Sequence, residues 1–308
     1  MRGKLILLLI WIMLLPFAEA EAYRFTDDNQ DEILLSHKPQ KTAVLFSSFA
    51  DMWLFSGGEI DITVGETIER GFAKNSTYLV DQGAGKKIDV EALIMAEPDF
   101  IIGSNDIPAH VRAKEQAEKA GIPFALFHVE SLDDYIRVFK IMTRINQNEE
   151  AFEVYANEVY ENAQRVIKEA EKFKETSLQT VLFIRSGSSY SSAKAKTKDM
   201  HFAAKMLDDL GAYNIAEDVP VIIDGLSFEE IYIKDPDAIF ISLMGNEEAA
   251  VEFMKTLLNE PRWQALKAVQ SGRCYFLSKE LFQYKPNAQW AKAYEEMAKM
   301  LYPEWTIE

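Results

Sequence analysis

The sequence feature that most constrains the fold is a helix-forming stretch that lies between two sets of strand-like segments. Residues 148–176 contain no glycine or proline, and apolar residues recur there at steps of three and four among Glu, Lys and Gln. This spacing predicts one amphipathic helix of about 27 residues, which would be about 40 Å long. A helix of that length can join two separate globular lobes.

Short apolar runs alternate with helix-like stretches on both sides of this helix. The runs cover residues 42–46, 99–103, 123–128, 180–184, 237–242 and 273–277. Their interiors are apolar at consecutive positions, which is typical of parallel strands whose sheet is buried on both faces. We therefore predict an α/β fold with two Rossmann-like lobes, each with a central parallel sheet, bridged by the single long helix.

The 308 residues exceed what one compact core usually holds, which also favours two lobes. The predicted division has four parts. They are a signal peptide at 1–22, an N-terminal lobe at 23–147, the interlobe helix at 148–176 and a C-terminal lobe at 177–308.

The first 22 residues have the composition of an export signal. Arg2 and Lys4 precede an unbroken apolar run over residues 5–15, and small residues follow it. This order is typical of a cleaved secretory signal peptide, and the run is shorter than the roughly 20 residues that span a bilayer. No cysteine follows the run, so we do not expect a lipoprotein. We expect an exported protein, periplasmic or on the extracellular side of the cytoplasmic membrane, that begins near Glu21 or Tyr23.

Charge and metal-binding residue types exclude several kinds of partner. A formal net charge of -16 disfavours nucleic-acid binding. The single cysteine, Cys274, allows neither an internal disulfide nor a cysteine-rich metal site. His37, His110, His128 and His201 are scattered and lack the spacing of a metal motif. We therefore expect no bare-metal site and no bound cofactor.

Sequence patterns of catalysis are incomplete in this chain. Residues 83–87 (GAGKK) resemble a phosphate-binding loop, but the upstream glycine and the Ser or Thr after the lysine are missing. Residues 186–192 are rich in serine and contain no G-x-S-x-G motif. We assign no catalytic residues and do not expect an enzyme.

One pattern occurs once in each predicted lobe. A helix-like segment with Glu91 leads to Pro98-Asp99 and an apolar run, and one with Glu229 leads to Pro236-Asp237 and an apolar run. Their order, together with the long helix, the signal peptide and residues 263–275 and 301–303, resembles the iron-siderophore, cobalamin and haem substrate-binding proteins of ABC importers. The resemblance covers the whole mature chain.

The resemblance implies a monomeric binding protein that captures a ferric siderophore or a similar iron(III) chelate in a cleft between its lobes. It also implies delivery to an ABC transporter permease with its ATPase, where Glu91 and Glu229 dock, one from each lobe. Two alternatives remain open. One is a cobalamin, other corrinoid or haem ligand for the same kind of importer, and the other is a non-transport extracytoplasmic module or enzyme on this fold.

Candidate ligand-binding residues follow the predicted strands, because open α/β sheets bind ligands beyond the carboxyl ends of their strands. They are Ser48, Phe49, Trp53, Ser104, Asn105, Arg185, Ser186, Met244, Lys279, Phe282, Tyr284 and Lys285. Arg185 is the principal candidate, since its planar guanidinium suits carboxylate, catecholate or phosphate oxygens. Trp53, Phe282 and Tyr284 would form flat apolar walls. The alternatives are a salt bridge for Arg185 and ordinary core packing for the aromatic rings.

Overall fold

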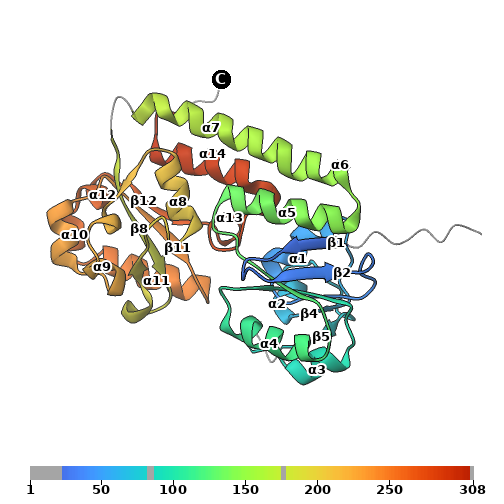
Figure 1. Cartoon of the computed structure of the whole chain (residues 1–308). Helices are drawn as coiled ribbons and strands as arrows, with labels where there is room; N and C mark the ends of the chain where they lie inside the picture. Colours follow the sequence, from blue (N-terminus) through green and yellow to red (C-terminus); the bar gives the residue numbers. More distant parts are fainter. Residues whose placement is uncertain (1–22, 82–86, 175–177, 306–308) are drawn as a thin grey trace, which may run out of the picture.

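Two α/β lobes lie side by side in the computed structural model, which describes residues 23–81, 87–174 and 178–305. Each lobe has a parallel sheet with helices on both faces, and long helices lie across one side of the pair (Figure 1). The predicted two-lobed α/β fold is confirmed. The predicted signal peptide (1–22) and most of the glycine-rich loop (83–86) lie outside the described residues. None of the described helices is both long enough and apolar enough to cross a membrane.

The sheet of the N-terminal lobe is parallel throughout, in the strand order β5-β4-β3-β6-β7. Its strands are β3 (Thr42–Val44), β4 (Ile62–Thr63), β5 (Tyr78–Leu79), β6 (Phe100–Ser104) and β7 (Phe124–Phe127). Its helices are α1 (Ser47–Phe55), α2 (Gly65–Glu69), α3 (Val90–Met95), α4 (Pro108–Lys119) and α5 (Leu132–Asn146). Phe100 and Ile102 pack on the side of α1 and α5, and Ile101 packs on the side of α3 and α4. Burial on both faces explains why β6 is apolar at consecutive positions.

The sheet of the C-terminal lobe has the order β10-β8-β11-β12, with β9 added antiparallel to β8. Its strands are β8 (Thr180–Ser186), β9 (Lys194–Ala195), β10 (Tyr213–Asn214), β11 (Ala238–Leu243) and β12 (Cys274–Leu277). Its α-helices are α8 (Phe202–Asp209), α9 (Val221–Asp224), α10 (Phe228–Lys234), α11 (Glu247–Leu258), α12 (Lys267–Gln270), α13 (Lys279–Phe282) and α14 (Trp290–Leu301). Short 3-10 turns cover Tyr190–Ser192, Ile215–Glu217, Trp263–Ala265 and Asn287–Gln289. Phe183 and Leu182 pack on opposite faces of β8, so this sheet is also buried on both sides.

The pattern that occurs twice in the sequence is also repeated in the backbone. The helix α3 is followed by Glu97 with φ at 47°, and α10 is followed by Asp235 with φ at 39°. Both residues adopt the left-handed conformation that often ends a helix, and Pro98 and Pro236 come next, where the helix cannot continue. Equivalent helix ends therefore lead into the equivalent strands β6 and β11.

The aspartate after each of these prolines binds the start of the neighbouring strand. Asp99 accepts hydrogen bonds from the backbone N–H groups of Gln40 at 2.7 Å and Lys41 at 3.0 Å, just before β3. Asp237 accepts from the N–H of Thr180 at 2.8 Å and from its hydroxyl at 2.7 Å, at the start of β8. The Pro-Asp pair thus has a structural reason, because it joins two adjacent parallel strands at their amino ends.

The long predicted helix is continuous through the described residues but contains one irregular turn. It consists of α6 (Glu149–Phe152), a π-helical turn (Glu153–Asn157) and α7 (Glu158–Lys174). The hydroxyl of Tyr135 on α5 donates to the carbonyl of Tyr155 within this turn. A π turn shifts the helical bonding pattern, and this contact gives the Tyr155 carbonyl a partner outside the helix. Residues 175 and 176 of the predicted helix, and with them the boundary at 176, lie outside the described residues.

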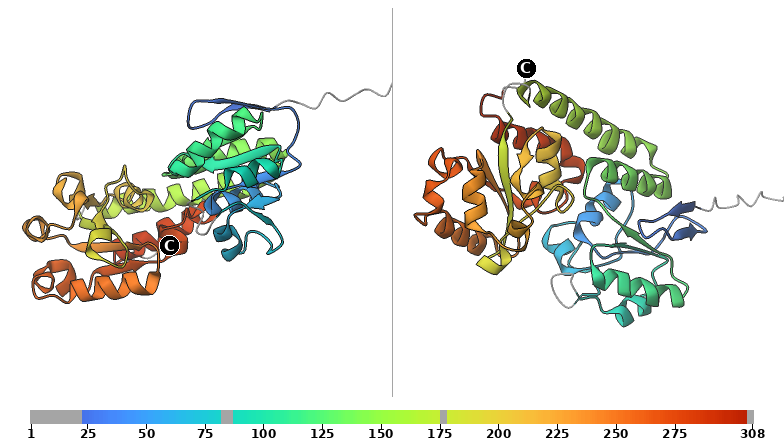
Figure 2. Two further views of the ribbon diagram at one scale, coloured as in Figure 1. Left: turned by 90° about the horizontal axis from the view of Figure 1, so that it is seen from below. Right: turned by 60° about the vertical axis from the view of Figure 1, so that its left-hand side comes forward.

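The C-terminal helix α14 lies along α7, as Figure 1 and both views of Figure 2 show. Phe173 near the end of α7 stacks on Tyr302 with a ring separation of 5.1 Å. Ala163 on α7 and Trp290 on α14 belong to one apolar cluster that includes Phe127 of β7 and Phe183 of β8. The two lobes are therefore joined by a shared core as well as by the long helix.

An antiparallel hairpin that the sequence pattern did not indicate precedes the N-terminal lobe. It consists of β1 (Tyr23–Thr26) and β2 (Glu32–Leu35). The buried Asp27 carboxylate in its turn accepts from the Leu126 N–H at 3.0 Å and from Lys114 Nζ at 2.7 Å. Lys114 of α4 is itself buried. A buried ion pair thus attaches the hairpin to the lobe.

We predict that Lys114→Ala lowers the free energy of unfolding by about 3 kcal/mol or more, because it leaves the buried Asp27 carboxylate without its cation. Urea unfolding followed by circular dichroism measures this. Lys299→Ala is the control, since Lys299 pairs with Glu295 on an exposed helix surface. Such surface pairs contribute less than about 1 kcal/mol. Equal losses for the two variants would contradict the importance of the buried pair.

Candidate functional site

A cavity of about 350 Å³ lies between the two lobes at the carboxyl ends of their strands. Phe46 follows β3, Ser104 ends β6, and Arg185 lies near the end of β8, and all three line the cavity. The N-terminal lobe contributes Leu45, Phe46, Ser48, Val64, Glu66, Ser104, Asp106, Ile107 and Glu130. The C-terminal lobe contributes Arg185, Met200, His201, Phe202, Gln283, Tyr284 and Lys285. This is the position at which α/β folds bind ligands.

Five of the predicted ligand-binding residues line this cavity. They are Ser48, Ser104, Arg185, Tyr284 and Lys285. The structure brings them together from both lobes, although they are up to 237 residues apart along the chain. Their contact with a ligand remains a prediction.

Two of the predicted apolar walls, Trp53 and Phe282, lie in the protein core instead, as does the predicted ligand-binding residue Phe49. Phe49, Trp53 and Phe282 are each only 1% exposed. The indole N–H of Trp53 donates to the Glu59 carbonyl at 2.8 Å, and the ring packs so closely on Gly58 that a Cβ there would lie 2.3 Å from it. The expectation that Trp53 and Phe282 form cavity walls is corrected here, because α1 and α13 turn these rings, like that of Phe49, toward the core.

The remaining predicted residues, Asn105, Ser186, Met244 and Lys279, do not line the cavity. Ser186 is buried and donates to the carbonyl of Gly187 at 2.9 Å. Lys279 Nζ donates to the carbonyl of Gly245 at 3.0 Å. These positions are corrected for the same reason, since following a strand does not by itself direct a side chain into the cavity.

Three acidic residues of the cavity, Glu66, Asp106 and Glu130, were not among the sequence candidates. Asp106 and Glu130 lie two and three residues after β6 and β7, so extending the strand-end rule by one turn would have included them. Glu66 lies on α2, and its sequence surroundings carry no comparable signal. The cavity therefore contains more negative charge than the sequence candidates suggested.

Glu130 and Lys285 connect the two lobes at the cavity. The Glu130 carboxylate accepts from Lys285 Nζ and from the backbone N–H of Phe202 at 3.0 Å, which begins α8. Lys285 Nζ also lies 4.8 Å from the centre of the Phe202 ring. An ion pair, a backbone hydrogen bond and a cation–π contact thus meet at one point between the lobes.

Arg185 is half-buried and has no carboxylate salt-bridge partner among the described residues. Its Nε donates to Gln283 Oε1 at 3.3 Å, and that oxygen also accepts from Ser242 Oγ at 3.1 Å. Burial lowers the pKa of Arg185, while the negative charge of Glu130 opposes this effect. The alternative of a salt bridge for Arg185 is not seen here, and the rest of its guanidinium is available to a bound anion.

His201 is a neutral imidazole at the cavity wall. Burial, with the positive charges of Lys285 and Arg185, lowers its pKa well below the usual range. Its Nδ1 accepts from the N–H of Ala203, so it caps the start of α8. His128 differs, because its hydrogen bond to Asp106 at 3.0 Å raises its pKa. Within the described ranges, no three His, Cys, Asp or Glu side chains are grouped so that they could hold a metal ion.

Comparison with known proteins agrees with this arrangement of two lobes. The family model described as periplasmic binding protein matches residues 43–281. The chain belongs to the periplasmic binding protein family. The match extends over the parallel sheets of both lobes and over α7, and it includes every cavity residue of this periplasmic binding protein except Gln283, Tyr284 and Lys285. No curated protein matches the chain.

Solved structures share the fold of this periplasmic binding protein over nearly its whole length. Siderophore binding protein BauB, solved with two acinetobactin molecules and ferric iron, is 16% identical with a TM-score of 0.72, covering 92% of this chain and 100% of BauB. SirA of Staphylococcus aureus with staphyloferrin B is 17% identical with a TM-score of 0.68, covering 91% and 97%. The haem-binding protein RhuT of Roseiflexus sp. RS-1 is 16% identical with a TM-score of 0.68, covering 85% and 98%. At these identities the likeness concerns the fold alone.

A buried polar network of this periplasmic binding protein crosses between the lobes beside the cavity. Asn287 Nδ2 of the C-terminal lobe donates to the Ser48 carbonyl at 2.6 Å and to Asp51 Oδ1 at 2.5 Å. Arg70 Nη1 donates to Ser47 Oγ at 3.0 Å, and its guanidinium lies 4.1 Å from the centre of the Tyr284 ring. Arg70 thus holds Tyr284, one of the aromatic residues of the cavity, from the opposite lobe.

Asp51 is the most unusual acid of this network. Burial raises its pKa to about 7, although the positive charge of Arg70 and the bond from Asn287 act in the opposite direction. Tyr135 also faces this carboxylate. Burial and, to a lesser extent, the negative charge of Asp51 raise the pKa of the tyrosine. Near neutral pH the Asp51 carboxyl therefore changes its charge inside the interlobe contact.

We predict that Asp51→Asn changes how stability depends on pH. The folded protein holds a proton on Asp51 up to its pKa of about 7, whereas the unfolded chain loses it near the ordinary aspartate pKa of 3.8. This group therefore makes the folded state less stable as pH rises between those values. We compare the free energy of unfolding of the variant with that of the wild type. The difference, variant minus wild type, should increase by on the order of 1 kcal/mol per pH unit across this window and stay constant above pH 8.

Urea unfolding at several pH values measures this difference, with Asp237→Asn as the control. Burial alone would raise the pKa of Asp237, but its bonds to Lys267 and Thr180 outweigh burial and lower it. Its contribution is therefore lost only as pH falls below the ordinary range of aspartate, so the control difference should be level between pH 5 and pH 8. If the difference in unfolding free energy between Asp51→Asn and the wild type also stayed constant between pH 5 and pH 8, the prediction would be contradicted.

Proposed function

We propose that this protein is the extracytoplasmic substrate-binding component of an ABC importer and that it captures a ferric siderophore or a similar iron(III) chelate. The observation that carries the proposal is the half-buried guanidinium of Arg185 at the wall of the interlobe cavity, without a carboxylate partner among the described residues. A buried cation in such a place favours an anionic ligand. The chain then binds and hands over its ligand rather than transforming it.

The other cavity residues suit the chemistry of an oxygen-rich chelate. Lys285 provides a second cation, and Ser48 and Ser104 provide hydroxyl groups. Tyr284 presents a ring from the C-terminal lobe against which the ligand's apolar parts can pack. Glu130 already compensates Lys285, so an anionic ligand would share Lys285 with Glu130 and bind Arg185 directly.

Proteins with the same fold support the proposed class of ligand. BauB was solved with ferric iron bound by two acinetobactin molecules, and SirA was solved with staphyloferrin B. Both match this chain over more than nine-tenths of its length. The proposal applies that class of ligand to the cavity described above.

Haem is a second candidate, favoured by two residues of the cavity wall. Met200 is 45% exposed there, and the neutral imidazole of His201 lies beside it. Thioether sulfur and neutral imidazole are both axial ligands of haem iron in proteins. RhuT, which has the same fold, is a haem-binding protein. Absorbance of the loaded protein separates this candidate from a ferric siderophore.

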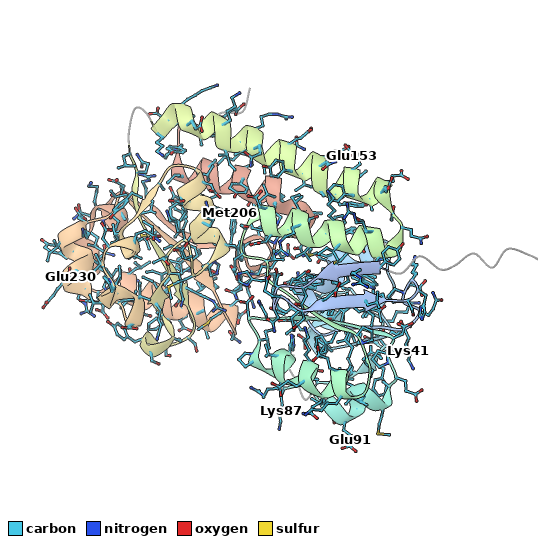
Figure 3. All side chains as sticks on the ribbon, in the orientation of Figure 1. Lys41, Lys87, Glu91, Glu153, Met206 and Glu230 are labelled. Atoms are coloured by element: carbon cyan, nitrogen blue, oxygen red, sulfur yellow. The ribbon has the colours of Figure 1, made fainter. Side chains whose placement is uncertain are left out.

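Delivery to the permease is proposed to use one glutamate on each lobe. Glu91 on α3 and Glu229 on α10 are both exposed and occupy equivalent positions before the Pro-Asp pairs. Figure 3 shows Glu91 and Glu230, the neighbour of Glu229, pointing outward at the far ends of the two lobes. A permease that contacts both lobes would reach across the cavity opening between them.

We predict that the mature protein binds one ferric chelate class with sub-micromolar affinity and that Arg185→Ala weakens this binding at least about tenfold, the effect of losing a charge-assisted hydrogen bond. The measurement is quenching of tryptophan fluorescence by ferric hydroxamates, ferric catecholates, ferric citrate, haem and cobalamin. Trp290 is the reporter, because its ring lies 5.7 Å from that of Phe202 at the cavity.

Arg262→Ala serves as the control for this measurement, because Arg262 pairs with Glu260 on the exposed surface of the C-terminal lobe. Its affinity should equal that of the wild type. Tight binding of haem or cobalamin would keep the transport role and replace the ligand. No binding by any member of the panel would contradict the proposed function.

We further predict that Glu91→Gln with Glu229→Gln abolishes uptake of the chelate into cells and leaves the affinity for the chelate unchanged. Both carboxylates lie away from the cavity, and removing their charge would remove attraction to a basic permease surface. Uptake of iron-55 as its chelate measures this effect. Glu153→Gln, exposed on the π turn at the side of the long helix (Figure 3), should leave uptake intact.

A further inference from the structure

Two apolar side chains are far more exposed than the other large apolar residues of the described chain. Met95 is 74% exposed and Ile233 is 73% exposed, whereas the next, Leu178, is 56% exposed. Single exposed apolar residues are ordinary on a protein surface. Here, however, the two extreme cases occupy equivalent positions in the two lobes.

Met95 is the last residue of α3, four residues after Glu91, and Ile233 lies on α10, four residues after Glu229. Residues four apart share one face of a helix. Each lobe therefore presents an exposed glutamate and, one turn further on, an exposed apolar side chain. We call these pairs the N-lobe patch (Glu91, Met95) and the C-lobe patch (Glu229, Ile233).

The backbone after each patch keeps the two arrangements alike. The left-handed residues Glu97 and Asp235 end the two helices, and the following Pro-Asp pairs bind the neighbouring strands. The same left-handed residue and Pro-Asp pair therefore fix which face of the helix points outward in both lobes. Figure 1 shows α3 and α10 at the outer ends of their lobes, away from α7.

We propose that Met95 and Ile233 are the apolar contacts through which the two lobes dock on the membrane permease. This inference rests on the proposed transport function and adds to it, since it assigns a contact beside each glutamate. Each patch fits a recess of the partner that has basic groups for the glutamate and apolar groups for the adjacent side chain. Apolar side chains surrounded by polar groups are the usual energetic centre of such interfaces.

The pairing of the patches indicates the kind of partner. Two like patches on two like lobes match a partner with two like halves, such as a permease built from two related subunits or domains. A second copy of this chain is disfavoured, because both patches are acidic and the chain carries a net charge of -16. The partner surface is therefore basic and apolar, and it lies at the membrane where the ligand is delivered.

The experiment compares Met95→Ser, Ile233→Ser and the double variant with wild type and with Leu178→Ser, the control of next-highest exposure, directly before β8. Affinity for the ferric chelate is measured by tryptophan fluorescence, and uptake of iron-55 as the same chelate is measured in cells that carry the importer. We expect unchanged chelate affinity for every variant. Half-maximal uptake should require at least about tenfold more double variant than wild type, the effect of losing a buried apolar contact, and Leu178→Ser should match wild type.

The outcomes separate this inference from the function on which it rests. Wild-type uptake with equal uptake by the double variant would overturn the apolar contacts and keep the importer role. Loss of uptake in the Leu178→Ser control to the same extent would also overturn them, because the effect would not depend on position. A wild-type protein that binds no chelate and supports no uptake would overturn the proposed function together with the inference.

Discussion

One continuous apolar cluster holds the two lobes in a fixed relation, and the cavity depends on it. The cluster runs from Phe127 in the N-terminal sheet, through Ala163 on α7 and Trp290 on α14, to Phe183 in the C-terminal sheet. Close-packed interiors deform little, because each side chain is confined by its neighbours. The walls of the cavity, which belong to different lobes, therefore face each other at a set separation. A flexible linker in place of α7 and α14 would leave Arg185 and Ser48 without a common site.

Polar contacts between the lobes add a second, more adjustable connection. Glu130 binds Lys285, and Asn287 binds Asp51, and both contacts lie beside the cavity. Buried polar groups are costly when a partner is lost, so such contacts favour one particular arrangement of the lobes. A ligand that competes for Lys285, or a pH at which Asp51 changes its charge, acts on this second connection while the apolar cluster remains. The helices α3 and α10, which we propose to dock on the permease, belong to the same two lobes.

The cavity was partly predictable from the sequence, and the reasons for success and failure are geometric. Parallel strands end at one edge of a sheet, so Ser104 and Arg185 could be placed there from their positions after apolar runs. The helix α1 begins three residues after the last residue of β3, and each residue of a helix turns by about 100° from the last. That rotation directs Ser48 to the cavity and Phe49 to the core. The pattern of apolar runs predicts where the strands end but not this rotation. Glu66 reaches the cavity only because α2 packs beside α1.

The sequence by itself determined the two α/β lobes, the long helix between them and the Pro-Asp pair that follows a helix in each lobe, because these depend on local periodicity and on residues that are neighbours along the chain. Tertiary structure alone decided that α14 lies along α7, that a π turn interrupts the long helix, and that Lys114 attaches the hairpin of Asp27. It also decided which side chains share the interlobe cavity. These features depend on contacts between residues that are far apart in the chain, and such contacts leave no periodic trace in the sequence around either partner.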